Sequence, residues 1–204
     1  MLIIDYHCGN PHSIKNMLKK IGVNSKISSE KEEIFNAEKL ILPGVGAFDH
    51  GMENLNKEGL TEVIREKVLS FKTPILGICL GAQLMGVSSE EGNLNGLELV
   101  EMQVKRFEVN KMDESHKIPH MGWSEIDIKK KHPIINNLPV DPRFYFVHSY
   151  HFEMINSADI LTTTTYGYEF TSSFQHENTF GVQFHPEKSH KYGMMLLKNF
   201  AENL

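Results

Sequence analysis

The first half of the chain alternates short apolar runs with segments of helical periodicity, and this alternation restricts the possible folds more than any other feature. Four apolar runs predict strands, at residues 2–6, 23–27, 39–42 and 74–78. Between and after them, apolar residues recur at helical spacing in three segments, 13–21, 51–71 and 80–87. Strands that alternate with helices pair in parallel, and the helices cover both faces of the sheet. The first half therefore predicts an open, mostly parallel α/β sheet.

The second half has a different pattern. Six segments resemble strands, at residues 97–107, 117–128, 143–147, 160–165, 170–175 and 180–184, most of them with no room for a helix in between. Such strands are expected to add an antiparallel extension to the sheet, and a last helix is predicted over residues 193–203. The expected fold is one α/β domain over residues 1–204: an open, mostly parallel sheet flanked by helices, with an antiparallel extension. Ligands of such sheets bind beyond the carboxyl ends of the strands.

Composition excludes several classes of protein. Hydrophobic residues make up 40% and charged residues 23% of the 204 residues, as in an ordinary globular protein, and the net charge of -5 argues against a nucleic-acid or membrane partner. The two cysteines, Cys8 and Cys79, form no CxxC pair, which favours a reducing compartment. Asp5 interrupts the first apolar run, and no run approaches the roughly 18 residues of a membrane helix. We expect a cytoplasmic protein.

Cys79 lies where a predicted strand meets a predicted helix, in the frame Gly-Ile-Cys-Leu-Gly over residues 77–81. A nucleophile at such a sharp turn has a strained backbone and needs small neighbours, which Gly77 and Gly81 supply. The helix that begins there directs free N–H groups and its positive dipole end at the sulfur, which favours the thiolate. A lone cysteine in an apolar run is usually a buried structural residue. The glycine frame therefore marks Cys79 as the candidate nucleophile, and Cys8, which lacks one, is expected to be structural.

His185 and Glu187 follow the last apolar run, with Pro186 between them. Residues i and i+2 of a strand point the same way, so both side chains face one side if the extended geometry persists through Pro186. A cysteine nucleophile needs a base, and the base needs a third group to fix its tautomer. His185 and Glu187 can fill these two roles. The other histidines show no metal-like spacing, and we predict neither a metal site nor a cofactor.

The segment 43–48 reads Pro-Gly-Val-Gly-Ala-Phe and follows the third predicted strand. Two glycines around Val45 let a peptide plane take orientations closed to other residues. Such a loop can present a backbone N–H to a developing oxyanion, together with the N–H of Leu80. Most loops of this composition have no role in catalysis. This segment is a candidate oxyanion loop because the chain also contains a candidate nucleophile and a candidate base.

Three motifs, over residues 43–46, 77–83 and 183–187, resemble those of the class I (triad) glutamine amidotransferases. Segments 89–92, 119–123 and 144–150 narrow the likeness to the glutaminase subunits of imidazole glycerol phosphate synthase, and it runs nearly from end to end of the chain. The resemblance implies that Cys79 attacks the glutamine amide, that His185 moves the proton and that Glu187 orients His185.

The same resemblance implies further roles. The bound glutamine would be surrounded by four residues, Gln83, Glu91, His148 and Ser149, and the oxyanion N–H groups would come from Gly46 and Leu80. The ammonia would pass through a (β/α)8 cyclase partner in a heterodimer. That partner would make imidazole glycerol phosphate and an aminoimidazole carboxamide ribotide, in histidine biosynthesis.

Some residues depart from the pattern, and they leave alternatives open. His7 and Cys8 precede Gly-Asn where a small pair is common, and His151 stands where a second tyrosine is common. These departures also resemble a branch whose members supply ammonia to an N-acetyl sugar amidotransferase of surface-polysaccharide biosynthesis. A third interpretation is a catalytically silent docking subunit. The presence of Cys79, His185 and Glu187 together argues against it, because a silent subunit does not need all three residues.

Overall fold

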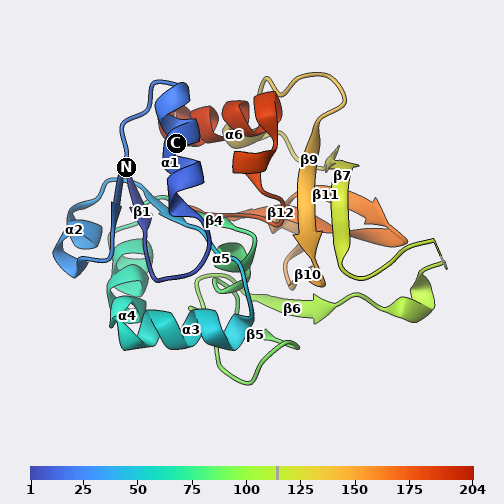
Figure 1. Ribbon diagram of the computed structural model, residues 1–204, viewed down its shortest axis with the longest axis horizontal. Helices are drawn as coiled ribbons and strands as arrows, with labels where there is room; N and C mark the ends of the chain where they lie inside the picture. The colour runs from blue at the N-terminus through green and yellow to red at the C-terminus, as the bar shows by residue number, and fades with distance from the viewer. Residues whose placement is uncertain (114) are drawn as a thin grey trace.

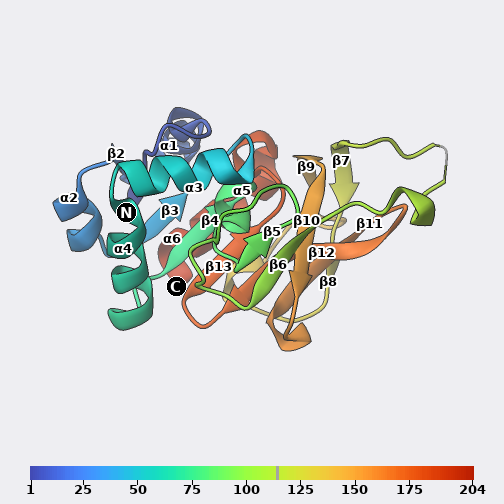
Figure 2. The same cartoon turned by 90° about the horizontal axis from the view of Figure 1, so that it is seen from below.

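The computed structural model describes residues 1–113 and 115–204, and in this part of the chain its largest element is an eleven-stranded sheet between two layers of helices (Figures 1 and 2). The strands of the first half and the last strand are β1 Leu2–Ile4, β2 Lys26–Ser28, β3 Leu40–Leu42, β4 Ile75–Ile78 and β13 Thr179–Val182. Their neighbours in the sheet are β5 Ser88–Ser89, β6 Met102–Arg106, β8 Asp127–Ile128, β10 Tyr150–Met154, β11 Ile160–Tyr166 and β12 Tyr168–His176. The main order is β2-β1-β3-β4-β13-β12-β10-β6-β5, and β11 joins β12 to β8.

Helices cover both faces of the parallel part. They are α1 Pro11–Lys20, α2 Lys31–Asn36, α3 Phe48–Lys57, α4 Leu60–Arg65, α5 Leu80–Gln83 and α6 His190–Asn203. A π-helical turn follows α4 at Glu66–Ser70, and short 3-10 turns occupy Val109–Lys111, Pro133–Ile135, Ser157–Asp159 and Pro186–Lys188. Helices α1 and α6 lie together on one face, and α3 and α4 lie on the other (Figure 1).

The core follows from the two-residue period of the strands. In β1, Leu2 and Ile4 pack into the cluster under α3 and α4, whereas Ile3 packs into the cluster under α1 and α6. β3 divides its residues in the same way, with Ile41 on the α6 side. A strand that is buried on both faces reads as a continuous apolar run, and these are the runs that predict a parallel sheet.

The predicted fold class is confirmed: the sheet is mostly parallel in its first half, and an antiparallel extension follows. The last predicted strand is an exception to the antiparallel second half. β13 pairs in parallel with β4 and antiparallel with β12, so it joins the two parts of the sheet. A separate antiparallel pair, β7 His120–Glu125 with β9 Arg143–His148, stands at one end of the molecule (Figure 1).

Several predicted boundaries are wrong, each for a local reason. The first helix begins at Pro11, because the Asn10 side chain caps it by accepting a hydrogen bond from Ser13 N–H. The single helix predicted over residues 51–71 is divided at Gly59, whose φ of 64° ends one helix and starts the next. Helix α2 and strand β10 were not predicted, because both segments are short and have weak periodicity.

The candidate site lies at one edge of the parallel sheet. The carboxyl ends of β3, β4 and β13 open directly into the segments of residues 43–48, Cys79 and His185. Because these strands are adjacent and parallel, their carboxyl ends meet at the same edge. In the described residues, no helix has the length and apolar character that crossing a membrane requires.

Candidate active site

Cys79 occupies a strained turn between β4 and α5. Its φ of 52° and ψ of -114° lie outside the regions that side-chain-bearing residues favour. The turn needs its two glycines: a Cβ on Gly77 would lie 2.5 Å from Ala82 Cα, and one on Gly81 would lie 1.9 Å from the Leu42 carbonyl oxygen. The predicted sharp elbow is therefore present, and its backbone holds the sulfur at the edge of the sheet.

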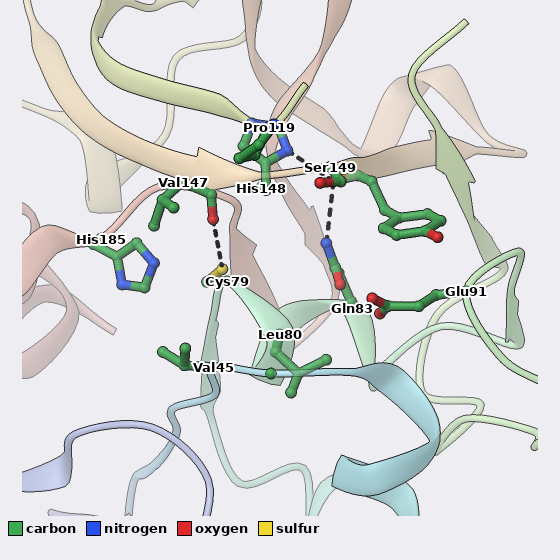
Figure 3. A pocket seen from close by; sticks show the side chains of 12 residues that line it. Val45, Cys79, Leu80, Gln83, Glu91, Pro119, Val147, His148, Ser149 and His185 are labelled. Atoms are coloured by element: carbon green, nitrogen blue, oxygen red, sulfur yellow. Dashed lines mark hydrogen bonds between the residues drawn. The ribbon is translucent and has the colours of Figure 1, made fainter. Parts of the chain in front are cut away.

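The Cys79 side chain is 7% exposed and faces the pocket of Figure 3. Its thiol lies 3.9 Å from the Val147 carbonyl oxygen, an acceptor on β9. Its other close polar neighbour is Gln183, whose amide nitrogen Nε2 lies 3.7 Å from the sulfur. The Cys79 sulfur is thus in contact with both the parallel sheet and the separate β7–β9 pair.

His185 and Glu187 form a buried pair. Glu187 Oε1 lies 2.7 Å from His185 Nδ1, and the two side chains are 7% and 1% exposed. The extended geometry assumed for this segment is wrong, because Pro186–Lys188 forms a 3-10 turn. The turn still brings the carboxylate back to the imidazole, and Ser189 Oγ donates to the His185 carbonyl at 2.6 Å to hold it.

The charge state of His185 depends on this pair. Burial opposes a charged imidazole, but the interactions with Cys79 and Glu187 outweigh it and raise the pKa of His185 above its usual value. The outer nitrogen Nε2 is buried without a hydrogen-bond partner among the described residues. The sulfur is thus near enough to affect the imidazole electrostatically but is not hydrogen-bonded to it. Hydrogen bonds of this kind often close only when substrate binds.

The loop 43–48 lies against the start of α5. Its first part is buried: a Cβ on Gly44 would lie 2.5 Å from Gly81 N, and Tyr6 Oη donates to the Pro43 carbonyl at 2.6 Å. The next residues are loosely packed, since Val45 is 52% exposed and a Cβ on Gly46 would meet nothing within 4 Å. The loop is therefore anchored at one end and open where its peptide planes face the pocket.

Two backbone N–H groups remain available near the sulfur. Among the described residues, no group accepts a hydrogen bond from Leu80 N–H or from Gly46 N–H, and both residues line the pocket. Leu80 is the first residue of α5, where N–H groups have no acceptor within the helix. Gly46 has a φ of 118°, which a residue with a side chain rarely adopts.

The pocket has a volume of about 230 Å³, and the structure brings all four predicted glutamine-binding residues to it: Gln83, Glu91, His148 and Ser149. This volume is below the ~300–1,000 Å³ of pockets for drug-sized ligands, so it suits a small molecule. Glu91 Oε2 accepts a hydrogen bond from Phe48 N–H at 2.9 Å. Burial raises the pKa of Glu91, against that hydrogen bond.

His148 is fixed by a chain of hydrogen bonds that the sequence did not reveal. Its Nδ1 lies 2.7 Å from the Tyr150 carbonyl and its Nε2 3.0 Å from His120 Nδ1, and His120 Nε2 lies 2.8 Å from Ser124 Oγ. Burial and the neighbouring His120 lower the pKa of His148 well below its usual value, and burial lowers the pKa of His120 to about 4. Both rings are therefore neutral near pH 7.

A carbonyl oxygen can only accept, so the tautomers follow in order. His148 carries its proton on Nδ1 and accepts at Nε2 from His120, which in turn accepts from the Ser124 hydroxyl.

The site groups that the sequence did not predict are His120, Gln183 and the carbonyls of Val147 and Tyr150. Gln183 stands two residues before His185, a spacing that could have indicated a shared face. Among the described residues, no cluster of three or more His, Cys, Asp or Glu side chains is arranged to hold a metal ion.

Comparison with known proteins gives a consistent result. Residues 2–204 match the family described as "Glutamine amidotransferase class-I". The chain is 48% identical over 202 residues to "Imidazole glycerol phosphate synthase subunit HisH 2" of Pseudomonas aeruginosa, covering 99% of this chain and 98% of that protein. It is 50% identical over 200 residues to the protein of the same name from Methanococcus maripaludis, covering 98% of each.

Solved structures show the same fold at lower identity. One described as "Crystal structure of glutamine amidotransferase" superposes with a TM-score of 0.73 at 18% identity, over 98% of this chain and 97% of that one. Another, described as "Structure of PurLQS from Thermotoga maritima", superposes with a TM-score of 0.71 at 17% identity, over 98% of this chain and 95% of the other. At these identities the likeness concerns the fold alone.

Proposed function

The chain belongs to the class I glutamine amidotransferase family, and we propose that it hydrolyses L-glutamine as the glutaminase subunit of imidazole glycerol phosphate synthase. The observation that carries this proposal is the convergence on one small pocket of Cys79, the His185–Glu187 pair and two backbone N–H groups that have no acceptor among the described residues. These are the parts that acyl transfer from an amide requires.

The reaction begins with the Cys79 sulfur bonding to the carboxamide carbon of glutamine. The carbonyl oxygen becomes an oxyanion, which the N–H groups of Leu80 and Gly46 stabilise. The thiol proton passes to His185 Nε2, which has no other partner among the described residues, and from there to the leaving nitrogen. Ammonia departs, and the acyl group stays on sulfur as a thioester.

Water then attacks the thioester carbon, with His185 accepting its proton. The carbon–sulfur bond breaks, glutamate leaves, and the proton returns to the Cys79 sulfur. Throughout, Glu187 holds Nδ1 of the imidazole, so that Nε2 faces the reacting atoms. The raised pKa of His185 is consistent with a ring that accepts a proton from the thiol and carries it as an imidazolium.

Four pocket residues are assigned to the substrate by the same proposal: Gln83, Glu91, His148 and Ser149. Glu91 is suited to the α-ammonium group of glutamine, because a partly buried carboxylate with a raised pKa gains from a cationic partner. Neutral His148 adds no positive charge beside that ammonium group. Ser149 supplies polar atoms beside His148, across the pocket from Val45 and Leu80 (Figure 3).

The ammonia would be used by a second protein chain. The relatives reported above are themselves named as subunits of imidazole glycerol phosphate synthase. We assign to this chain a cyclase partner of (β/α)8 type, a heterodimer and a place in histidine biosynthesis. The names of these relatives do not favour the alternative of a sugar amidotransferase partner. The silent docking subunit is disfavoured by a buried, hydrogen-bonded His185–Glu187 pair beside Cys79.

The test is glutamate release by the purified chain, alone and with a cyclase of histidine biosynthesis carrying its acceptor. Glutamate release that requires Cys79, and that rises when the cyclase is added, supports the proposal. A sugar amidotransferase partner is the comparison arm. Activation by that partner and not by the cyclase would transfer the chain to the alternative pathway, and no release with either would overturn the glutaminase itself.

A further inference from the structure

Gln183 is the buried polar neighbour of the nucleophile that the mechanism above does not use. Its side chain is fully buried. Its amide nitrogen Nε2 lies 3.7 Å from Cys79 Sγ, within the distance of an N–H···S hydrogen bond, and its backbone N–H donates to the Ser172 carbonyl at 2.9 Å. The backbone that carries this amide is therefore fixed next to the Cys79 sulfur.

The direction of this amide follows from its partners. Gln83 Nε2 lies 3.2 Å from the Tyr150 carbonyl and 3.1 Å from Gln183 Oε1. A carbonyl oxygen only accepts, so Gln83 must turn its nitrogen toward Tyr150. That nitrogen has a second hydrogen, and only the oxygen of Gln183 can receive it. The Gln183 nitrogen must then face the sulfur, because a flipped amide would place two donors against each other.

The acceptor at the start of this series of hydrogen bonds is a backbone carbonyl. The Tyr150 carbonyl belongs to the first residue of β10, and it also accepts from His148 Nδ1 at 2.7 Å. One carbonyl therefore orients both His148 and the pair Gln83–Gln183 (Figure 3 shows the Gln83 and His148 bonds). Its two acceptor positions are both used, and a flipped Gln83 amide would place its oxygen against the Tyr150 carbonyl oxygen.

The two polar contacts of the sulfur have opposite preferences. The Val147 carbonyl accepts the S–H proton and favours the thiol, whereas an N–H donor favours the thiolate. We propose that Gln183 is a further catalytic residue, which holds the Cys79 sulfur in place and stabilises its thiolate through an N–H donor oriented by Gln83 and the Tyr150 carbonyl. This inference rests on the proposed function only in taking Cys79 as the nucleophile.

Other titratable groups near the sulfur must be kept constant in a test. They are His185 after β13, His148 at the end of β9, Glu91 on the pocket wall and Tyr6 after β1. None of these is changed by the substitution Gln183→Met, which keeps the length of the side chain and removes its donor.

The experiment measures the rate at which iodoacetamide alkylates Cys79 as a function of pH, without glutamine. Mass spectrometry of the peptide that contains Cys79 separates it from Cys8. In Gln183→Met, the midpoint of the rate against pH should move up by about one unit, a roughly tenfold smaller thiolate fraction below the midpoint. The kcat for glutamine should fall about tenfold, with KM changing less.

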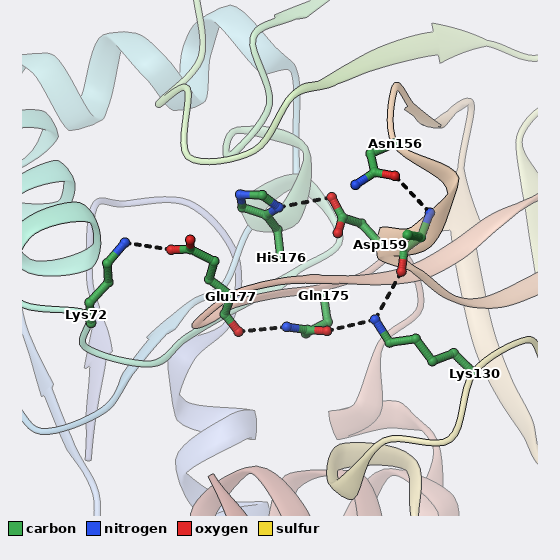
Figure 4. Close-up of polar contacts among 8 residues, drawn as sticks. Lys72, Lys130, Asn156, Asp159, Gln175, His176 and Glu177 are labelled. Carbon is green, nitrogen blue, oxygen red and sulfur yellow. Dashed lines mark hydrogen bonds and ion pairs between the residues drawn. The ribbon is translucent and has the colours of Figure 1, made fainter.

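Gln175→Met is the matched control. Gln175 lies in a network on the molecular surface, where it accepts from Lys130 Nζ and donates to the Glu177 carbonyl (Figure 4). It belongs to β12, the same strand that holds Ser172. Its replacement removes an amide of the same size away from the pocket and should leave the alkylation midpoint unchanged.

A folded Gln183→Met chain with an unchanged or lowered midpoint would overturn the inference, with thermal unfolding used to verify the fold. Should that variant not fold, Gln83→Met decides. The free amide of Gln183 would then lose its orientation, so the midpoint should rise by less than one unit, and no rise overturns the inference. Because alkylation needs no glutamine, absence of glutamate release by the unaltered chain with either partner present would reject the proposed function without affecting this result.

Discussion

At the residue scale, the site depends on one strained backbone position. Cys79 adopts a positive φ of 52°, and conformations of this kind cost on the order of 1–3 kcal/mol and persist only where the surroundings impose them. Here Gly77 and Gly81 provide the clearance, and Cys79 N–H donates to the Val182 carbonyl at 2.8 Å. Because these backbone contacts impose the geometry, we expect the fold to survive truncation of the side chain.

The first prediction follows from this. Cys79→Ala should retain its thermal stability and lose glutamine hydrolysis by several orders of magnitude, since the covalent route is gone. The measurement is glutamate release from glutamine, with ammonia-dependent synthesis by the partner as the control. That synthesis should survive, because free ammonia bypasses this chain. Retention of even a tenth of the hydrolysis rate would refute the assignment of Cys79.

The second prediction separates the base from the residue that orients it. His185→Ala should reduce kcat more than Glu187→Gln does, because a neutral amide can still hold the imidazole at Nδ1. In one well-studied triad protease, the acid member alone cost less than the nucleophile or base. Steady-state kcat for the two variants is the measurement. Equal losses would indicate that Glu187 does more than orient His185.

At the element scale, the β7–β9 pair carries two buried histidines, His120 and His148, whose lowered pKa values make stability depend on pH. The pKa of His120 is about 4 in the folded chain, below the ordinary value of 6.5. Between these values the unfolded chain binds a proton that the folded chain does not, so stability rises with pH there and falls as the pH drops below about 6.5. His148 acts in the same direction, because burial lowers its pKa also.

The third prediction concerns the replacement of one of these titratable side chains. Asn at position 120 cannot titrate, and its amide nitrogen can replace Nδ1 as the donor to His148. His120→Asn should therefore reduce the slope of the unfolding free energy between pH 4.5 and 6 by up to about 1.4 kcal/mol per pH unit. Urea unfolding across that range measures the slope. His12→Asn, at an exposed position on α1, is the control, and an equal change there would contradict the assignment.

At the scale of the whole molecule, the pocket is completed from two sides that belong to different parts of the fold. The parallel sheet supplies the strand ends with Cys79 and His185, and the β7–β9 pair supplies His148 and the Val147 carbonyl. The exposed half of the loop 43–48 is open on the pocket side. A partner protein that contacts this edge could therefore change the orientation of the loop.

The fourth prediction concerns that partner. We expect the isolated chain to be a poor glutaminase, because Val45 is about half exposed and Gly46 has open space beside its α-carbon, so little packing holds one peptide orientation. Docking of the acceptor-bound cyclase should stabilise the orientation in which Gly46 N–H faces the oxyanion. Gain of one such donor corresponds to about 2.7–4 kcal/mol, a roughly 10²–10³-fold rise in kcat. Glutamate release with and without the loaded cyclase measures it, and full activity in the isolated chain would exclude the idea.

The sequence by itself determined the parallel sheet, and it marked Cys79, His185 and Glu187 as the candidate reacting groups. Both could be predicted because they depend on local sequence. Continuous apolar runs result from burial of a strand on two faces, and a cysteine between two glycines results from the clearance that a sharp turn needs. The likeness to the glutamine amidotransferases assigned the pocket residues, all of which the structure brings to one pocket. Helix ends were less accessible, since a cap such as Asn10 or a break such as Gly59 depends on single dihedral angles.

Only the tertiary structure decided which groups meet across large sequence separations. It placed β13 in parallel beside β4, which brings His185 to Cys79, and it curled the segment 186–188 so that Glu187 reaches the imidazole. It also set the hydrogen-bond chains that end at the Tyr150 carbonyl. The physical reason is that a backbone carbonyl carries no side-chain signature, so its role as an acceptor arises only where the folded chain places a donor against it.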